Sequence, residues 1–215
     1  CQWCDQPEAL TAQKIARVET EPGKHHFEQV NNPVSAEQIL IYLEKLRGPG
    51  KLTMSVSITG GEPLLQVNFH KELFPALKKE GYEIYLETAG VFPDRLEELI
   101  EHVDISALDI KLPSSTGMDP LWEEHEKTLQ VAVLKEAFVK VVCTHDTKPA
   151  EVLKAAEIVS KVDLKIPFVL QPVTPFGPIK RRPTPDQMLS FQAAASRYLS
   201  DVRVIPQMHK IMGAM

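Results

Sequence analysis

The sequence predicts an α/β fold in which parallel strands are covered by outer helices, in the form of a partial (β/α) barrel. From residue 36 onward, helical and strand patterns alternate along the chain, and the six predicted strands are nearly continuous apolar runs. Alternation at this pitch is typical of βαβ units, and strands without a polar face are typical of sheets buried on both sides. A flat doubly wound sheet would give the same alternation, and the number of strands alone does not exclude it.

Capping and breaking residues set the limits of several elements. Ser35 can cap a helix that runs to about Arg47, and Gly81 can end the amphipathic helix that begins at Phe69. Pro149 stands in the first turn of a later helix, where its missing N–H costs nothing. The other predicted elements are strands at 54–59, 82–88, 103–112, 138–144, 164–173 and 202–205, and helices at 93–102, 121–136 and 185–199.

We expect a single domain over residues 1–215, since a chain of this length can bury one substantial core. Residues 11–33 lack a clear period and contain Pro22-Gly23 and His25-His26. They are therefore predicted to form a long loop excursion, and loops of this length are usually functional or mobile.

Composition narrows the class of protein. Hydrophobic residues make up 43% of the chain and charged residues 25%, as in ordinary globular proteins. The formal charge of −5 is spread over interspersed acids and bases, so we expect no nucleic acid or membrane surface as a partner. No apolar run reaches the length of a transmembrane helix, and three cysteines do not form a disulfide framework. A reducing cytoplasm is the expected compartment.

The chain opens with a pair of cysteines, Cys1-Gln2-Trp3-Cys4. Thiolates at this spacing are soft ligands for iron or zinc. No second Cys-x2-Cys or His-x3-His completes a zinc site, and a thioredoxin-like motif would continue directly into a helix, where Asp5-Gln6-Pro7 stands instead. Taken alone, the pair leaves iron, half of a zinc site, a redox pair and no ligand all open.

A second motif, Thr59-Gly60-Gly61-Glu62-Pro63, follows an apolar β-branched run. Two glycines let the backbone approach a ligand closely, and the carboxylate of Glu62 can accept a hydrogen bond from an ammonium group. A strand-to-helix turn with a proline in its first turn would explain the same residues without any ligand.

Together the two motifs resemble the radical S-adenosylmethionine (SAM) superfamily, whose cluster loop reads Cys-x3-Cys-x-aromatic-Cys. Cys1 and Cys4 match its second and third cysteines, so the first would lie four positions before Cys1, with a preceding strand, and the sequence as given would be inactive without them. The resemblance implies a [4Fe-4S] cluster with Cys1 and Cys4 among its metal ligands, and an open iron that chelates SAM. One electron from the cluster would cleave the sulfonium and yield a 5′-deoxyadenosyl radical. A strand before the cluster loop favours the partial barrel.

The strand ends carry further polar residues. Glu87-Thr88-Ala89-Gly90 is similar to the Glu-Thr-Asn-Gly segment that meets the ribose in this superfamily, although a solvated strand end remains an alternative. Asp109 and Lys111 stand within an apolar strand, so each must be paired or must bind a ligand. We expect Lys111 to bind the carboxylate or ribose of SAM, with an ion pair to Asp109 or Glu87 as the alternative.

The cofactor-binding residues implied by the resemblance are Trp3, Asp5, Gly60, Gly61, Glu62, Glu87, Lys111 and Gln171. Gln171 ends a predicted strand and would contact the adenine edge, unless its amide only satisfies a turn. No side chain is assigned a catalytic proton transfer.

The C-terminal segment Pro206-Gln207-Met208-His209-Lys210-Ile211-Met212-Gly213 is similar to the Pro-Gln-x-His-Lys-x-x-Gly signature of the 7-carboxy-7-deazaguanine synthase family. This resemblance implies a lyase of queuosine biosynthesis that contracts 6-carboxy-5,6,7,8-tetrahydropterin to 7-carboxy-7-deazaguanine. Thr59, His209, Lys210 and Met215 would bind the substrate. Flavodoxin or ferredoxin would be the reductant, and a homodimer is expected. A polar strand end is the alternative for the tail.

One position departs from the family. Its members carry a threonine that helps to hold Mg²⁺, and Gln6 stands there in this sequence. The longer amide arm would displace the ion, which puts magnesium in doubt. A glycyl-radical-enzyme activating enzyme and a non-catalytic zinc-binding α/β domain are the rival hypotheses.

Overall fold

The computed structural model describes residues 7–47 and 55–213 of the chain. Its main sheet has six strands in the order β3-β4-β5-β6-β7-β8, and every neighbouring pair is parallel. The strands are β3 (Ser55–Ile58), β4 (Glu83–Thr88), β5 (Ile105–Asp109), β6 (Glu136–Cys143), β7 (Phe168–Pro172) and β8 (Val202–Val204). This confirms the predicted parallel α/β fold and its six strands.

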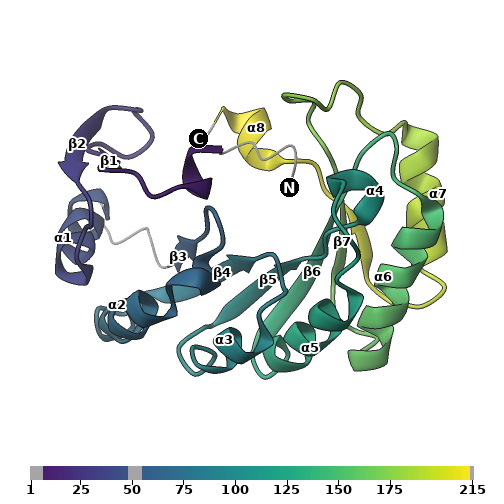
Figure 1. Ribbon diagram of the computed structural model, residues 1–215, viewed down its shortest axis with the longest axis horizontal. Coiled ribbons are helices and arrows are strands. Elements are labelled where there is room, and N and C mark those ends of the chain that lie inside the picture. The colour runs from purple at the N-terminus through teal and green to yellow at the C-terminus, as the bar shows by residue number, and fades with distance from the viewer. Residues whose placement is uncertain (1–6, 48–54, 214–215) are drawn as a thin grey trace.

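The sheet curves as a partial barrel does, and helices cover its outer face (Figure 1). The outer face carries α2 (Val67–Lys79), α3 (Pro93–Glu97), α5 (Trp122–Ala132), α6 (Pro149–Val162) and α7 (Pro185–Ala195). The short helices η1 (Pro7–Leu10) and α8 (Met208–Met212) lie beyond the ends of the strands, over the inner side of the curve. Two further short helices, η2 (Pro63–Gln66) and α4 (Pro113–Thr116), follow β3 and β5.

The hydrophobic core fills the space between the sheet and the outer helices. In β6, for example, Val139, Val141 and Cys143 are fully buried within the core cluster. The largest core side chains include those of Phe74 on α2 and Phe191 on α7. Burying side chains of this size is the main stabilising contribution to such a fold.

The inner face of the sheet is polar, which the sequence analysis did not predict. Along β4, buried residues alternate with the half-exposed side chains of Tyr85 and Glu87. On β5 and β6 the side chains of Asp109 and Lys140 are partly buried, with 14% and 20% of their surface exposed. Because strand residues two apart share a face, these charged side chains belong to one surface, opposite the core.

Most predicted element limits hold to within a few residues. Ser35 caps α1 (Ala36–Leu46) through a capping box with Gln38, and Pro149 occupies the first turn of α6. The helix predicted at 121–136 is shorter, because α5 ends at Ala132 and β6 already begins at Glu136.

Residues 11–33 contain two strands that the sequence analysis did not predict. β1 (Ile15–Glu19) and β2 (Phe27–Asn31) pair antiparallel, and the guanidinium of Arg17 lies 4.4 Å from the ring centre of Phe27. These strands have no buried residues, so their sequence lacks the apolar alternation that marks a strand.

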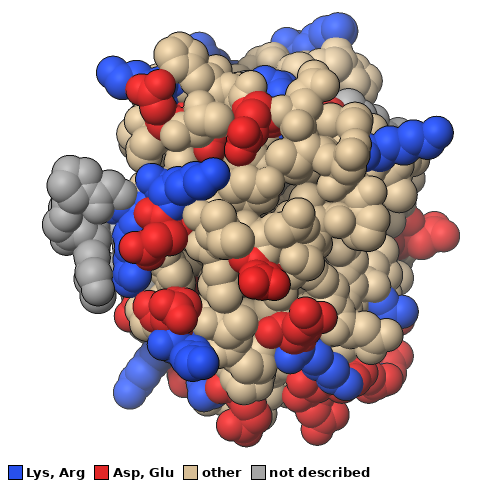
Figure 2. Space-filling view, turned by 90° about the vertical axis from the view of Figure 1, so that its left-hand side faces the viewer, with Lys and Arg blue, Asp and Glu red and all other residues tan. Residues whose placement is uncertain are grey.

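The side of the molecule formed by this hairpin, α1 and α2 has a mixed surface. Figure 2 shows basic and acidic side chains interspersed over it, without a broad field of either sign. Among the described residues, no helix combines the length and the apolar character that crossing a membrane requires.

Candidate functional site

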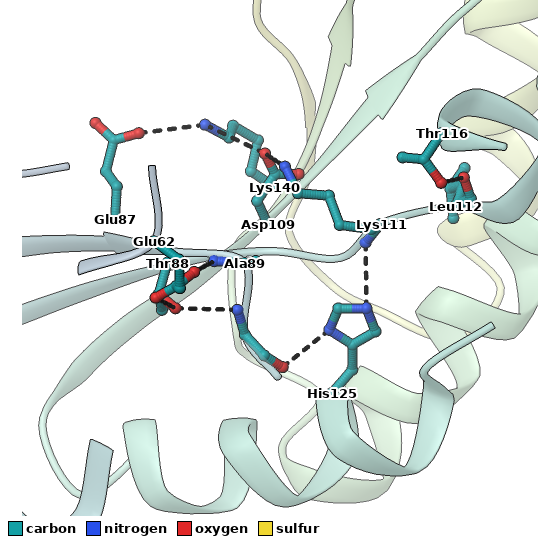
Figure 3. Close-up of polar contacts among 11 residues, drawn as sticks. Glu62, Glu87, Thr88, Ala89, Asp109, Lys111, Leu112, Thr116, His125 and Lys140 are labelled. Carbon is teal, nitrogen blue, oxygen red and sulfur yellow. Dashed lines mark hydrogen bonds and ion pairs between the residues drawn. The ribbon is translucent and has the colours of Figure 1, made fainter. Parts of the chain in front are cut away.

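The candidate site lies at the carboxyl edge of the sheet, where three consecutive strands end (Figure 3). Thr59–Glu62 follows β3, Glu87 and Thr88 end β4, and Asp109 ends β5 two residues before Lys111. Parallel strands bring their carboxyl ends to one edge, so motifs far apart in the sequence meet here.

The double-glycine turn is shaped by a close backbone contact. Gly60 and Gly61 have φ angles of 84° and 57°, a conformation that L side chains rarely adopt. A Cβ on Gly61 would lie 2.6 Å from the carbonyl oxygen of Ala9. Ala9 belongs to η1, the segment that follows the two N-terminal cysteines in the sequence, so this segment packs directly on the glycine turn.

The carboxylate of Glu62 is fixed by three hydrogen bonds. Its Oε1 accepts from the amide of Leu64 at 3.0 Å and from the hydroxyl of Thr88 at 2.8 Å, and its Oε2 accepts from the amide of Ala89 at 2.8 Å. A carboxylate has about four acceptor positions, so Oε2 retains one for a further donor. Glu62 therefore joins the end of β3 to the end of β4.

A row of alternating charges crosses the inner face of the sheet. The ammonium of Lys111 lies 2.7 Å from Asp109 Oδ2, and that of Lys140 lies 3.3 Å from Glu87 and 3.8 Å from Asp109. Lys111 thus forms the ion pair with Asp109 that the sequence left as an alternative to a ligand contact. The other oxygen, Asp109 Oδ1, is buried and has no hydrogen-bond partner among the described residues.

Lys140 was not predicted as a site residue, although the sequence contains a signal for it. It lies in β6 between Val139 and Val141, so it breaks an apolar run in the way that Asp109 and Lys111 do. Its position opposite Asp109 depends on the strand register, which pairs Asp109 with Lys140. A single sequence does not give that register.

His125 on α5 is a second residue that the sequence analysis missed. It is 1% exposed, its Nδ1 lies 3.0 Å from the carbonyl oxygen of Gly90, and its Nε2 accepts from the amide of Lys111 at 3.2 Å. Burial lowers the pKa of His125 to about 4, so the ring is neutral near pH 7. Its buried neighbours Thr128 and Leu129 are the sequence signal for an inward position.

The C-terminal segment folds against the loop that follows β7. Gln207 Oε1 accepts from the amide of Thr174 at 2.7 Å, and the ammonium of Lys210 lies 5.7 Å from the ring centre of Phe176. His209 and Lys210 are exposed on α8, which lies beyond the ends of the strands (Figure 1).

Comparison with known proteins identifies the family. The sequence profile of the radical SAM superfamily matches residues 1–174. The chain belongs to the radical SAM superfamily. It is 41% identical to the 7-carboxy-7-deazaguanine synthase of Geobacter sulfurreducens, over 99% of this chain and 84% of the relative. The synthase of Methanocaldococcus jannaschii is 33% identical, over 99% of this chain and 86% of the relative. Within the superfamily, the chain therefore belongs to the 7-carboxy-7-deazaguanine synthase family.

A solved structure supports the fold independently. The crystal structure of Streptococcus suis SuiB bound to S-adenosylmethionine superposes with a TM-score of 0.57 at 15% identity. The superposition covers 86% of this chain and 45% of SuiB. At this identity, the likeness concerns the radical SAM fold alone.

Several residues predicted for the radical SAM site lie outside the described residues: Cys1, Trp3, Cys4, Asp5, Gln6 and Met215. Among residues 7–47 and 55–213, no group of three His, Cys, Asp or Glu side chains is placed to hold a metal ion. Cys143 is fully buried, and burial together with the charge of Asp109 raises the pKa of its thiol to about 12. Cys143 therefore acts as a small core residue.

The described residues fit the chemistry of SAM. The glycine turn offers backbone, Glu62 retains an acceptor position for an ammonium group, and Lys111 offers a cation for a carboxylate. The unpartnered oxygen of Asp109 adds one buried acceptor beside them. Gln171 is half-buried at the end of β7, and Thr59 is exposed after β3.

Proposed function

We propose that this protein converts 6-carboxy-5,6,7,8-tetrahydropterin to 7-carboxy-7-deazaguanine with release of ammonia, a step towards queuosine. The main support is the identity of 41% to a named 7-carboxy-7-deazaguanine synthase along nearly the whole chain. Removal of one ammonia from the tetrahydropterin gives the composition of the contracted product, so the overall reaction needs no net oxidant.

The proposed cofactors are a [4Fe-4S] cluster and SAM, bound at the carboxyl edge of the sheet. When bound, they supply the one-electron chemistry of the superfamily. Cys1 and Cys4 would hold the cluster. The packing of η1 on Gly61 supports this assignment, since η1 follows the cysteines in the sequence.

The residues at the strand ends would bind and orient SAM. Glu62 would accept from its ammonium through the acceptor position left on Oε2, and Lys111 would exchange Asp109 for the SAM carboxylate. Glu87 would face the ribose. We also assign Gly60 and Gln171 to SAM, and Trp3 and Asp5 by resemblance.

Substrate binding is proposed at the side of the site nearest the tail. Thr59, His209, Lys210 and Met215 would contact the pterin, whose carboxylate calls for a cation such as Lys210. The position of α8 beyond the strand ends supports this proposal.

The test is product formation by the full-length protein, reconstituted anaerobically with iron and sulfide. Incubation with carboxytetrahydropterin, SAM and dithionite is expected to yield 7-carboxy-7-deazaguanine, detected by liquid chromatography with mass spectrometry. Omission of SAM or dithionite should abolish the product. An iron-loaded protein that binds SAM but leaves the pterin unchanged would refute the proposed reaction.

The same preparation tests the zinc hypothesis and the remaining cofactor. A colourless, iron-free protein after reconstitution would favour the non-catalytic zinc-binding domain. We propose that magnesium contributes little, because Gln6 replaces the expected threonine, and the Gln6→Thr variant should then respond more strongly to Mg²⁺ than the parent protein.

We further propose a cytoplasmic homodimer that is reduced by flavodoxin or ferredoxin. The buried free thiol of Cys143 suits a reducing compartment. Light scattering after size-exclusion chromatography should give twice the chain mass of 24.1 kDa, plus any residues that the expressed protein adds. A monomer at micromolar concentration would contradict the dimer.

A further inference from the structure

A continuous chain of hydrogen bonds links the segments that follow β3, β4 and β5 (Figure 3). The Thr88 hydroxyl donates to Glu62 Oε1 at 2.8 Å and accepts from the Gly90 amide at 3.2 Å. The Gly90 carbonyl oxygen lies 3.0 Å from His125 Nδ1, and His125 Nε2 accepts from the Lys111 amide at 3.2 Å. The path therefore runs from the double-glycine motif to the lysine assigned to SAM.

His125 differs from the other members of this chain because it comes from an outer helix. It projects from α5 to a position between the loop after β4 and the end of β5. A Cβ at Gly90 would lie 3.4 Å from His125 Nδ1, an ordinary van der Waals distance, so the imidazole ring packs against Gly90 without excluding a Cβ. The φ angle of Gly90 is 67°, and this left-handed conformation is the reason why the position favours glycine.

The hydrogen-bond partners of His125 determine which of its ring nitrogens carries the hydrogen. A carbonyl oxygen can only accept a hydrogen bond and a backbone amide can only donate one, so Nδ1 carries the hydrogen and Nε2 does not. A second proton on Nε2 would face the Lys111 N–H and break the link. Neutral His125 is thus both a donor and an acceptor, and two groups from different strands require it.

We propose that His125 is a positioning residue for SAM, which sets the place of Lys111 relative to Glu62 by bridging the Gly90 carbonyl and the Lys111 amide. It does not touch the cofactor itself, because its ring is enclosed between these two segments. This inference rests on the proposed assignment of Glu62 and Lys111 to SAM. His125 lies outside both the cysteine motif and the double-glycine motif.

Three variants separate the two halves of the bridge. His125→Asn keeps an amide N–H near the Nδ1 position, which serves Gly90, but offers no acceptor to Lys111. His125→Gln places an amide oxygen near the Nε2 position, which serves Lys111. His125→Phe keeps a ring and removes both bonds.

The measured quantity is the Kd for SAM of the anaerobically reconstituted full-length protein. Leaving the Lys111 amide unpaired is expected to weaken binding roughly tenfold in His125→Asn and at least about tenfold in His125→Phe. His125→Gln should remain within about threefold of the parent protein. The change that SAM causes in the electron paramagnetic resonance spectrum of the reduced cluster should shift to correspondingly higher SAM concentrations.

His70 provides a matched control. It is also buried, at 5% exposure, and its ring stacks on Phe74 with 4.8 Å between the ring centres. It lies on α2 and takes no part in the hydrogen-bond chain. His70→Phe should therefore leave the Kd for SAM unchanged, and iron content and unfolding temperature identify any variant that fails to fold.

Lys111→Met distinguishes failure of this inference from failure of the site assignment. If Lys111→Met binds SAM as tightly as the parent protein, the assignment of Lys111 is wrong and the inference falls with it. If Lys111→Met binds weakly while His125→Asn and His125→Gln both bind normally, the positioning role alone is overturned. Because the readout is SAM binding, an unchanged pterin in the product assay would leave this test intact. If His125→Phe fails to load iron, the Kd values for SAM of His125→Asn and His125→Gln decide whether His125 has the positioning role.

Discussion

Gly61 illustrates how one missing side chain can determine which segments meet at the site. Its left-handed backbone and the carbonyl oxygen of Ala9 both exclude a Cβ, and the second condition depends on a segment 52 residues earlier in the sequence. The residue therefore specifies both a turn and a contact.

Replacement of Gly61 by alanine is expected to weaken SAM binding as well as folding. A left-handed alanine costs about 1–2 kcal/mol, and the 2.6 Å approach to Ala9 requires η1 to move in addition. Gly81 is the control, because its φ angle is 80° but nothing lies within 4 Å of the added Cβ. Denaturant unfolding and SAM titration of both variants should show a binding loss only for Gly61→Ala.

The buried histidine gives a defined pH dependence of stability. Burial is the main cause of the pKa of about 4 in the folded protein, against an ordinary value of 6.5. The hydrogen bond to the Gly90 carbonyl is the largest influence that opposes this lowering of the pKa, followed by the charges of Asp109 and Glu124, whereas Lys111 adds to the lowering. The unfolded chain therefore binds a proton first as the pH falls, so the stabilisation is complete above pH 6.5 and is lost towards pH 4.

The size of this effect follows from the difference in pKa. It amounts to about 3 kcal/mol at most. His125→Gln should remove this part of the slope when the free energy of unfolding is measured between pH 4 and pH 7. Equal slopes for the variant and the parent protein would contradict a neutral buried His125.

Lys140 offers a test of the charge row. Lys140→Met leaves Glu87 and Asp109 without their shared cation, and we expect a loss of about 1–3 kcal/mol. Lys154 forms an ion pair of the same length, 3.3 Å, with Glu157 on the outer surface, so Lys154→Met should cost less than about 1 kcal/mol. Equal losses in urea unfolding would mean that the inner face contributes no more than the surface.

Much of the candidate site could be predicted from the sequence, because its motifs consist of residues that are unusual for their place in the chain. Two glycines before a glutamate and a lysine in an apolar run are visible without a structure. His125 and Lys140 escaped because their importance depends on which helix face packs inward and on which residues the sheet register sets opposite each other.

At the scale of single elements, capping boxes mark the starts of α1 and α7. Thr184 forms a capping box with Gln187 at the start of α7, whose Met188 and Phe191 are buried against the core. Both halves of this box were present in the sequence, and the predicted start of the helix at Pro185 is correct.

Thr184→Ala is expected to lower stability by about 1 kcal/mol, since one amide at the helix start loses its acceptor. Ser190 is exposed in the middle of the same helix, so Ser190→Ala should change stability by no more than about 0.5 kcal/mol. Thermal unfolding of the two variants measures the difference. A larger effect from Ser190→Ala would show that the cap does not stabilise α7.

Strands were harder to predict than helices where burial is slight. β6 buries Val139, Val141 and Cys143 and was predicted, whereas β1 and β2 have no fully buried residue and were not. β3 and β8 also have no fully buried residue, yet they were predicted. β3 and β8 belong to the regular alternation of helices and strands, which is a signal that the hairpin lacks.

For the whole molecule, the parallel arrangement could be predicted because helix and strand patterns alternate over most of the chain. The polar inner face could not be predicted, because each strand contains few charged residues. Only the register between neighbouring strands brings these residues together on one surface.

SAM should stabilise the whole domain through this surface. At a concentration of 100 times its Kd, a ligand that binds only the folded state adds about 2.7 kcal/mol. For a domain of this size, this corresponds to a rise of roughly 5–11 °C in Tm. Differential scanning calorimetry of the iron-loaded full-length protein with and without SAM measures the shift. An unchanged Tm under saturating SAM would mean that the folded domain has no such site.

The strand order has a consequence for biosynthesis. Because β3 to β8 are neighbours in the order in which they occur in the chain, each strand leaving the ribosome finds the edge of its predecessor already available. Among the described strands β4 to β8, each pairs with a strand that has already been made, and none has to be inserted between two that have already paired. The part of the sheet from β3 to β8 can therefore grow in a single direction while the chain is still being synthesised.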